Sequence, residues 1–180
     1  YKLALLRKLA RGEKNGLVRI YDYKKYLSSS YQQPKSALVS YLVSPVIDDL
    51  SGTQTSLFSN SGAGRTIPKI LNELGYIVDV INWDDTKPIK GEYDLMVFHG
   101  GKNFEQIKKV RTNRNKLVYY STGSYWRYHN DKEQKRLDYF QKRHNKQYKL
   151  DREIQDAEEQ ANTQADAIIS LGNQDAATTY

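Results

Sequence analysis

The amino-acid sequence predicts an α/β domain in which a parallel sheet is covered by helices on both faces, a three-layer α/β/α arrangement. Short apolar runs rich in β-branched residues alternate along the chain with segments of helical spacing, as in folds built on parallel strands. The 180 residues are enough for one such domain with a proper core and short for two. No run approaches the ~18 apolar residues of a membrane-spanning helix.

The first half of the predicted fold is a strand, a long connection, a helix and a second strand. SALVSYLV at Ser36–Val43 is the first strand. Ser44–Ser61 is rich in Ser, Gly, Asn and Thr, which predicts a connection without regular structure. Apolar residues recur at helical spacing through Arg65–Leu74, and Gly75 is suited to the left-handed position that ends a helix. YIVDVIN at Tyr76–Asn82 is the second strand.

The second half continues the alternation. The expected strands are the apolar runs Tyr93–His99, Lys116–Ser121 and Ala167–Leu171. The expected helices are Phe104–Val110, Asp131–Tyr148 and Glu153–Ala165. The middle helix is highly charged and has few apolar residues, so we expect it to be solvated.

The charge is distributed unevenly. Residues 1–35 hold nine Lys/Arg and two Asp/Glu, so they account for the whole net charge of +7, whereas residues 36–180 hold nineteen of each sign. We therefore divide the chain into a basic N-terminal arm and linker, 1–35, and a body, 36–180. Within the body, residues 86–152 are basic, but their lysines are interleaved with acids and no RNA-binding motif is present, so no nucleic-acid partner is expected.

The arm contains KLALLRKLAR at residues 2–11, where leucines share one helical face. A helix packed on a neighbouring domain is the favoured interpretation, and a basic amphipathic helix making peripheral contact with an anionic membrane is the alternative. No secretory signal is visible, so we expect a cytoplasmic protein, with the inner face of the membrane as the alternative location. The chain begins with Tyr1 and ends at Tyr180 within what resembles a helix start, and we interpret it as a piece of a longer protein.

Composition excludes several kinds of chemistry. There is no cysteine, which excludes disulfides, thiolate metal sites and cysteine nucleophiles. Three histidines, His99, His129 and His144, leave little material for a histidine-rich metal site. We therefore expect no metal.

Ligands of parallel α/β sheets bind beyond the carboxyl ends of the strands, so the residues after each strand are candidates. These junctions are Ser59–Arg65, Trp83–Asp84, His99–Gly101, Thr122–Ser124 and Gly172–Asn173. Four of the five contain glycine, which permits tight turns and close approach of a ligand.

The glycines at the first of these junctions are the most suggestive. Gly62, Gly64 and Arg65 open the first predicted helix, where free backbone N–H groups suit a phosphate or a carboxylate. A dinucleotide fingerprint is not complete, because Ile67 stands where a third glycine is needed and a long connection precedes the glycines. Asp84 and Asp85 mimic the ribose-binding acid, but NAD and S-adenosylmethionine rank low, and no phosphate-binding P-loop motif occurs.

Four segments of the body resemble a known family. SNSGAGRTIPKILNELGYIVDVINWDD, YDLMVFHGGKNFE, KLVYYSTGSYWRYHNDKEQKRL and ADAIISLGN, with a final Tyr180, resemble the N-terminal half of GT-B glycosyltransferases, more narrowly bacterial and archaeal members of the retaining family 4. The resemblance covers residues 36–180. It implies a Rossmann-like domain that is one half of a GT-B fold and whose C-terminal donor-binding partner domain lies outside this chain. Such a half binds mainly the acceptor and would not catalyse transfer alone.

The resemblance also implies a substrate class, the transfer of a sugar from a nucleotide-sugar donor to a glycan or lipid-linked acceptor, as in polysaccharide biosynthesis. Helix N-termini and Arg/Lys donors can stabilise the leaving diphosphate without a metal, so no cofactor is implied. Aromatic faces such as Tyr125 and Trp126 suit a sugar or an apolar acceptor. His129 is the first candidate for a catalytic base and His99 the second. The candidate substrate-binding residues are Gly62, Gly64, Arg65, Gly100, Thr122, Gly123, Trp126, Asn130 and Asn173.

One departure from the family pattern keeps other interpretations open. Many family-4 members have a histidine near the end of the fourth strand, where this sequence has Tyr120, Ser121 and Thr122. The chain could therefore be a non-catalytic α/β ligand-binding module of a multidomain protein. His99 could equally be a turn residue bonded to the backbone, and Trp126 a packing residue.

Overall fold

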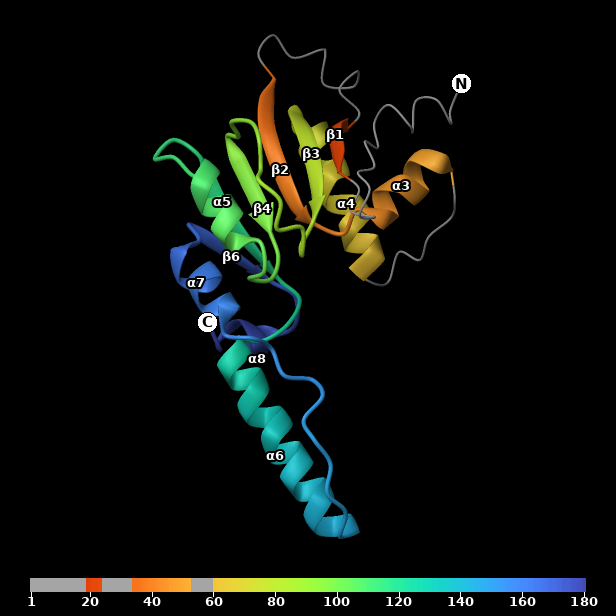
Figure 1. The fold of residues 1–180 in the computed structure, drawn as a ribbon. Coiled ribbons are helices and arrows are strands. Elements are labelled where there is room, and N and C mark those ends of the chain that lie inside the picture. Colours follow the sequence, from red (N-terminus) through yellow and green to blue (C-terminus); the bar gives the residue numbers. More distant parts are fainter. Residues whose placement is uncertain (1–18, 24–33, 53–59) are drawn as a thin grey trace.

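A computed structural model describes residues 19–23, 34–52 and 60–180. They form a six-stranded sheet, in the order β1-β3-β2-β4-β5-β6, with helices on both faces (Figure 1). The strands are β1 Ile20–Tyr23, β2 Lys35–Tyr41, β3 Tyr76–Asn82, β4 Leu95–Phe98, β5 Lys116–Ser121 and β6 Ala167–Ser170. The helices are α3 Ser44–Ser51, α4 Asn60–Glu73, α5 Phe104–Val110, α6 Trp126–His144, α7 Ala157–Gln164 and α8 Gln174–Ala177.

Five of the six strands are parallel, as the alternation of strands and helices predicts. β2 pairs with β3 on one side and with β4 on the other, and the sheet continues in parallel through β5 to β6. The α/β class is therefore confirmed. β1 is the exception, because it pairs antiparallel with β3 at one edge. It lies within residues 1–35, so the sheet begins before the boundary at residue 36, and the description of residues 1–35 as an arm is wrong for β1.

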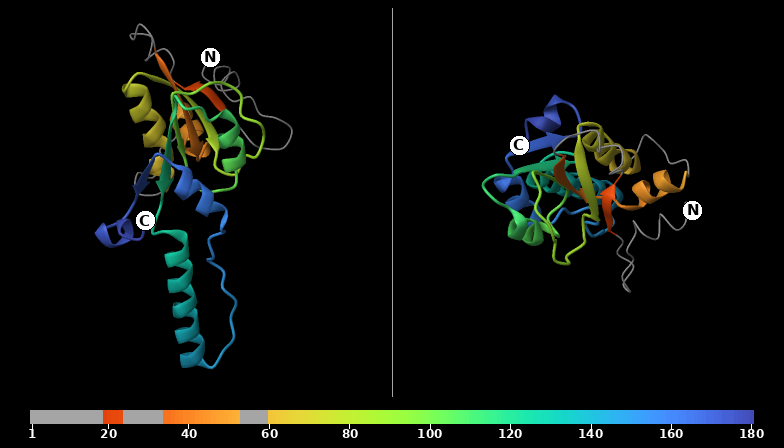
Figure 2. Two further views of the ribbon diagram at one scale, coloured as in Figure 1. Left: turned by 90° about the vertical axis from the view of Figure 1, so that its left-hand side faces the viewer. Right: turned by 90° about the horizontal axis from the view of Figure 1, so that it is seen from above.

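Two apolar cores lie on opposite faces of the sheet, because successive side chains of a strand point to opposite sides. In β2, Ala37 and Val39 belong to the core beneath α3 and α4, which includes Val46 and Leu71. Leu38 belongs to the other core, which α5 and α7 cover together with the loop between β3 and β4. Figure 2 shows these layers in two further views.

Three of the predicted elements match the structure at both ends: Tyr76–Asn82, Phe104–Val110 and Lys116–Ser121. The predicted connection after β2 is wrong over its first part, which forms α3. Pro45 stands in the first turn of α3, where its missing N–H is harmless. Val46 is fully buried and Ile47 packs against the same core, so burial of an apolar face outweighs the polar composition.

The helix predicted at Arg65–Leu74 is α4, which already includes Asn60. Gly62 and Gly64 are therefore helical residues, although glycine has a low helix propensity. Their value is their small size. A Cβ at Gly64 would lie 3.1 Å from Leu42 Cβ and 3.3 Å from Pro45 Cγ, so glycine lets α4 approach the end of β2 closely.

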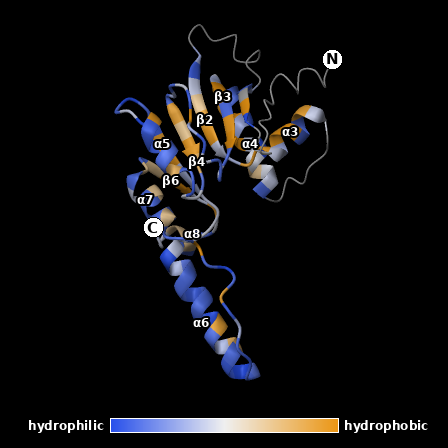
Figure 3. Ribbon diagram, in the orientation of Figure 1, coloured by the Kyte–Doolittle hydropathy of each residue, from blue (hydrophilic) through white to orange (hydrophobic). Residues whose placement is uncertain are grey.

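α6 and the segment that follows it project from the body (Figure 1). We call this projection the α6 arm, to distinguish it from the N-terminal residues 1–35. None of the residues of α6 is buried, and Figure 3 shows its ribbon as mainly hydrophilic, which confirms the prediction of a solvated helix. The helix ends at His144 because Asn145 adopts a left-handed conformation with φ 50°. The chain then returns through residues 145–156 to α7.

The basic helix predicted at residues 2–11 lies outside the described residues. In the part of the chain that the structure describes, no helix combines the length and the apolar character needed to cross a bilayer.

Candidate functional site

The order of the strands defines a switch point at the carboxyl edge of the sheet. β2 lies between β3 and β4, so the chain leaves β2 toward one side and later returns to the other. Ligands of open α/β sheets bind at such a point. Tyr41 ends β2 and His99 follows β4, and their rings meet edge to face with centroids 5.1 Å apart. The structure thus places the predicted residue His99 where a ligand site is expected.

Three aromatic rings lie beside His99 and a fourth, that of Tyr120, meets the Tyr41 ring; we call the five residues the His99 cluster. Its members are Tyr41, Trp83, His99, Tyr119 and Tyr120. His99 Nδ1 lies 2.9 Å from the carbonyl oxygen of Tyr120. Because a carbonyl only accepts hydrogen bonds, Nδ1 carries the proton, and Nε2 of the neutral ring is the acceptor. The backbone contact anticipated for His99 is real, but it orients the ring, and no hydrogen bond to Nε2 is found among the described residues.

Two buried polar atoms at this edge have no hydrogen-bond partner among the described residues: Tyr41 Oη and Asn103 Oδ1. Asn103 Nδ2 donates to Ser40 Oγ at 2.5 Å and to the Asn82 carbonyl at 3.3 Å. Burial, with a smaller contribution from the neighbouring Tyr120, raises the pKa of Tyr41 to about 12, so its hydroxyl remains a donor at neutral pH. Unpaired buried polar atoms are uncommon. The switch point therefore has hydrogen-bonding capacity that the described residues do not use.

The two glycines after β4 are in close contact with neighbouring segments. Gly100 has φ +67°, and a Cβ there would lie 3.0 Å from Trp83 Cε3, so the predicted ligand-binding glycine supports the Trp83 ring. A Cβ at Gly101 would lie 2.8 Å from Ala157 Cβ and closer still to the Ala157 carbonyl group. Lys102 Nζ lies 4.9 Å from the centroid of the Trp83 ring, which places a cation beside that ring.

The first turn of α7 supplies two carboxylates that the sequence analysis did not single out. Tyr119 Oη donates to Glu158 Oε2 at 2.5 Å, and burial, followed by the charge of Glu158, raises the pKa of Tyr119. Glu159 accepts hydrogen bonds from Tyr125 Oη and from Trp126 Nε1, the latter at 2.8 Å. These bonds, that of Tyr125 first, lower the pKa of Glu159. The acidic first turn of a helix was the available signal.

Trp126 is the candidate that the sequence offers as a sugar platform. Its indole N–H is bonded to Glu159, and Arg127 lies 5.2 Å from its ring centroid. The ring is only partly buried. Glu159 of α7 and the adjacent Arg127 therefore fix the orientation of the Trp126 ring. Part of the side chain remains accessible.

The junctions after β5 and β6 are joined by polar contacts to Tyr180. Ser121 Oγ contacts Tyr180 Oη, and Tyr180 Oη donates to the Gly123 carbonyl at 3.2 Å. Thr122 is exposed, and no atom lies within 4 Å of a Cβ built on Gly123. Asn173 caps α8, because its Oδ1 accepts from the Ala176 N–H at 3.1 Å. Thr122 and Gly123 are thus open to a ligand, whereas the Asn173 side chain is used by the fold.

His129 and Asn130 lie at the base of the α6 arm. His129 Nε2 is 3.0 Å from the Arg152 carbonyl oxygen. Asn130 Nδ2 donates to the Ile154 carbonyl at 2.8 Å, and Asn130 Oδ1 accepts from the Ile154 N–H at 2.9 Å. Both side chains therefore bind the return segment of the α6 arm rather than the His99 cluster.

The glycine-rich start of α4 packs on the end of β2, where Gly64 faces Leu42, the residue after Tyr41. Arg65 Nη1 lies 3.9 Å from Asp49 Oδ1, at a hollow of about 340 Å³ that both residues line. Gly62 and Gly64 are buried, and Gly64 lies more than one turn into the described helix, where backbone amides bond within the helix. The Gly64 amide is thus used within the helix, and Arg65 is the residue of this segment that lines a hollow.

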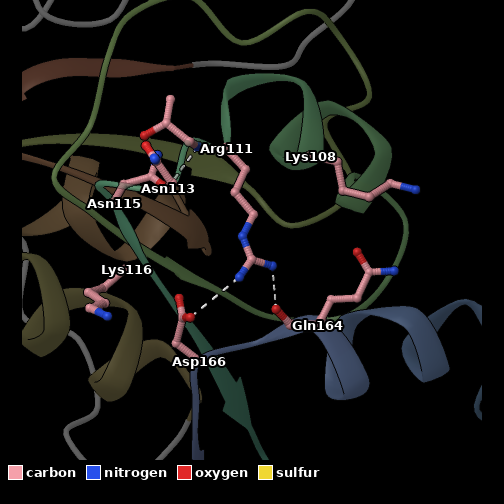
Figure 4. Close-up of a pocket in the computed structure, with 8 residues that line it drawn as sticks. Lys108, Arg111, Asn113, Asn115, Lys116, Gln164 and Asp166 are labelled. Atoms are coloured by element: carbon pink, nitrogen blue, oxygen red, sulfur yellow. Dashed lines mark hydrogen bonds and ion pairs between the residues drawn. The ribbon is translucent and has the colours of Figure 1, made fainter.

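A second hollow, of about 470 Å³, lies at the opposite edge of the sheet, beside the amino ends of β5 and β6 (Figure 4). Arg111 donates to the Gln164 carbonyl and pairs with Asp166 at 3.4 Å. Asp166 Oδ2 also accepts from the Leu117 N–H at 2.7 Å. These charged groups join α5 to the β5–β6 edge, so we assign this hollow a structural role.

Among residues 19–23, 34–52 and 60–180, no three His, Asp or Glu side chains gather in a way that could hold a metal ion. Comparison of the chain with protein-family models, with curated proteins and with solved structures finds no match.

Proposed function

We propose that the carboxyl edge around His99 is a ligand-binding site and that the chain is the acceptor-side half of a glycosyltransferase. In this proposal the domain is Rossmann-like, one half of a GT-B fold, and the enzyme moves a sugar from a nucleotide-sugar donor to a glycan or lipid-linked acceptor. The observation that carries the proposal is the position of His99 at the switch point, with Nδ1 fixed by the Tyr120 carbonyl. The resemblance of residues 36–180 to family-4 glycosyltransferases supplies the substrate class.

The His99 cluster has the groups that an acceptor sugar needs. Trp83 offers an aromatic face, and Tyr41 Oη is a donor without a protein partner in the described chain. Histidine is the side chain that most often acts as a general base. As the acceptor oxygen bonds to the anomeric carbon and the bond from that carbon to the donor phosphate breaks, the hydroxyl proton passes to His99 Nε2.

The leaving nucleoside diphosphate carries negative charge, which positive groups of the proposed enzyme beside the donor phosphates stabilise. Lys102 supplies a cation beside Trp83 in the His99 cluster. Arg65, in α4, remains a candidate for contact with the nucleotide-sugar donor. Most donor contacts come from the second domain of the proposed enzyme.

The test is nucleotide-sugar turnover by the natural polypeptide that contains this chain. His99→Ala is expected to lower kcat by about 10²-fold or more, the usual contribution of a general base, in a protein that still unfolds cooperatively. His129→Ala is the matched comparison, because its ring also contacts a backbone carbonyl. Turnover that survives His99→Ala and disappears in His129→Ala would contradict the assignment of the base.

A second candidate function is a ligand-binding module without catalysis. It is favoured by one observation, the occurrence of Tyr120, Ser121 and Thr122 where many family-4 enzymes carry a histidine. Saturable binding of a saccharide by a polypeptide that turns over no nucleotide sugar would support this function against the enzyme.

A further inference from the structure

The α6 arm ends in a basic and aromatic tip, residues 139–149. The tip contains Lys142, Arg143, Lys146 and Lys149 and no Asp or Glu. These four side chains are exposed. Three aromatic side chains accompany them, with exposed fractions of 66% for Tyr139, 40% for Phe140 and 50% for Tyr148.

The charges of the tip differ from those nearer the base of the α6 arm. There, Lys135 pairs with Asp131 at 2.8 Å and Arg136 with Glu133 at 2.6 Å, so positive charge is neutralised along the helix. At the tip, Lys142, Lys146 and Lys149 have no acidic partner among the described residues. Unpaired positive charge is therefore concentrated where the α6 arm is farthest from the body (Figures 1 and 2).

The aromatic side chains of the tip are held in one arrangement. The rings of Phe140 and Tyr148 meet edge to face with centroids 5.4 Å apart, and the Tyr148 N–H donates to Gln141 Oε1 at 2.8 Å. Asn145, with its left-handed backbone, makes the turn between them. The tip thus presents fixed rings and cations to solvent, although none of its side chains contributes to either core.

We propose that the tip of the α6 arm docks on an anionic lipid surface. Lys and Arg side chains attract anionic headgroups, and amphipathic aromatic rings are favoured at the boundary between headgroups and acyl chains. A single-stranded nucleic acid is bound along an extended basic groove with successive stacking platforms, whereas this patch is confined to the end of the α6 arm. The tip is a different segment of the sequence from residues 1–35, for which peripheral membrane contact is the alternative prediction, and the proposal does not depend on the glycosyltransferase assignment.

The experiment measures co-sedimentation of the full chain with vesicles of 70% phosphatidylcholine and 30% phosphatidylglycerol at low salt. The test variant is Lys142→Gln/Lys146→Gln/Lys149→Gln. The matched control is Lys90→Gln/Lys109→Gln/Arg114→Gln, which makes the same change in net charge at exposed positions outside the α6 arm. Each basic residue near the surface contributes about fivefold to binding, so we expect the test variant to bind about a hundredfold more weakly than the wild type and the control to bind nearly normally.

A second variant, Tyr139→Trp, reports on the environment of the tip without removing charge. The emission that this variant adds to that of the wild type, which contains Trp83 and Trp126, is expected to shift to shorter wavelength with the anionic vesicles and not with pure phosphatidylcholine. High salt is expected to reverse the binding, because it screens exposed charges. Three outcomes overturn the proposal: no binding of the wild type to anionic vesicles, equal losses in the test and control variants, and binding of a 20-nucleotide RNA in place of vesicles with the same dependence on the three lysines.

Discussion

Replacing Gly101 by alanine is expected to separate α7 from the loop after β4. A Cβ at this position would lie 2.8 Å from Ala157 Cβ and closer to the Ala157 carbonyl group, whereas carbon atoms in contact normally stay about 3.5–4.0 Å apart. The opposing atoms belong to backbone and to a short side chain, so rotation of a side chain cannot relieve the clash. The first turn of α7 must move.

Two contributions set the expected loss in the free energy of unfolding of Gly101→Ala. Overpacking of this kind costs about 1–3 kcal/mol. Movement of α7 also withdraws Glu158 from the buried Tyr119 hydroxyl, a bond of 2.5 Å, and a hydrogen bond to a charged group is worth about 1.5–3 kcal/mol. Together they give a loss of about 3–5 kcal/mol, or about 10 °C in melting temperature for a chain of this size.

The assay is thermal and urea unfolding of Gly101→Ala beside Gly123→Ala. Gly123 follows β5 at the same edge of the sheet, but no atom lies within 4 Å of a Cβ built there, so its replacement should leave the melting temperature unchanged or slightly raised. Equal melting temperatures for Gly101→Ala and the wild type would refute the contact between α7 and this loop, and with it the role of α7 at the site.

Three further predictions concern single contacts. Arg19→Met leaves the carboxylate of Asp85 buried without the guanidinium that binds it at 2.5 Å, so the free energy of unfolding in urea should fall by about 3–5 kcal/mol; a loss below 1 kcal/mol would contradict the pairing. Burial opposes the shift, but the hydrogen bonds from Arg19 lower the pKa of Asp85. The pair therefore stabilises the fold fully above the ordinary pKa of aspartate, about 4, and this stability is lost as the pH falls through the lowered pKa. Asp85→Asn should remove this pH dependence. Tyr41→Phe should raise stability by about 1 kcal/mol, because it removes a buried hydroxyl that has no partner among the described residues, while weakening saccharide binding; lower stability would show that the hydroxyl is paired. Trp126 emission should change as the pH falls through the lowered pKa of Glu159, and a change that persists in Glu159→Gln would exclude this carboxylate as its cause.

Elements with a continuous apolar pattern could be predicted from the sequence. Tyr76–Asn82 and Lys116–Ser121 match the structure at both ends, because strands buried on both faces are apolar at successive positions. β1 could not be recognised in this way. Its sequence, IYDY at Ile20–Tyr23, lies in a basic segment and is a strand only through antiparallel pairing with β3. α3 was missed for the related reason that tertiary burial of Val46 outweighs local composition.

The sequence could predict single residues of the candidate site but not which residues from different elements come together there. His99 could be singled out because it follows an apolar strand, and ligands bind beyond strand ends. Tyr41 and Glu158 reach the same region from other elements, and their contacts depend on strand order and on the position of α7, which no local pattern specifies. His129 was ranked above His99, but its side chain binds the return segment of the α6 arm.

The most direct test of the proposed site is a side-chain NMR titration of the three histidines, in which His99, His129 and His144 are assigned by substitution. The probes are uridine diphosphate, guanosine diphosphate and a set of methyl glycosides. Binding at the switch point predicts that the His99 signals shift saturably with at least one probe, that Tyr41→Phe weakens this response, and that the His144 signals do not move. Saturable shifts confined to His129, or the absence of a saturable His99 shift with every probe, would contradict the site.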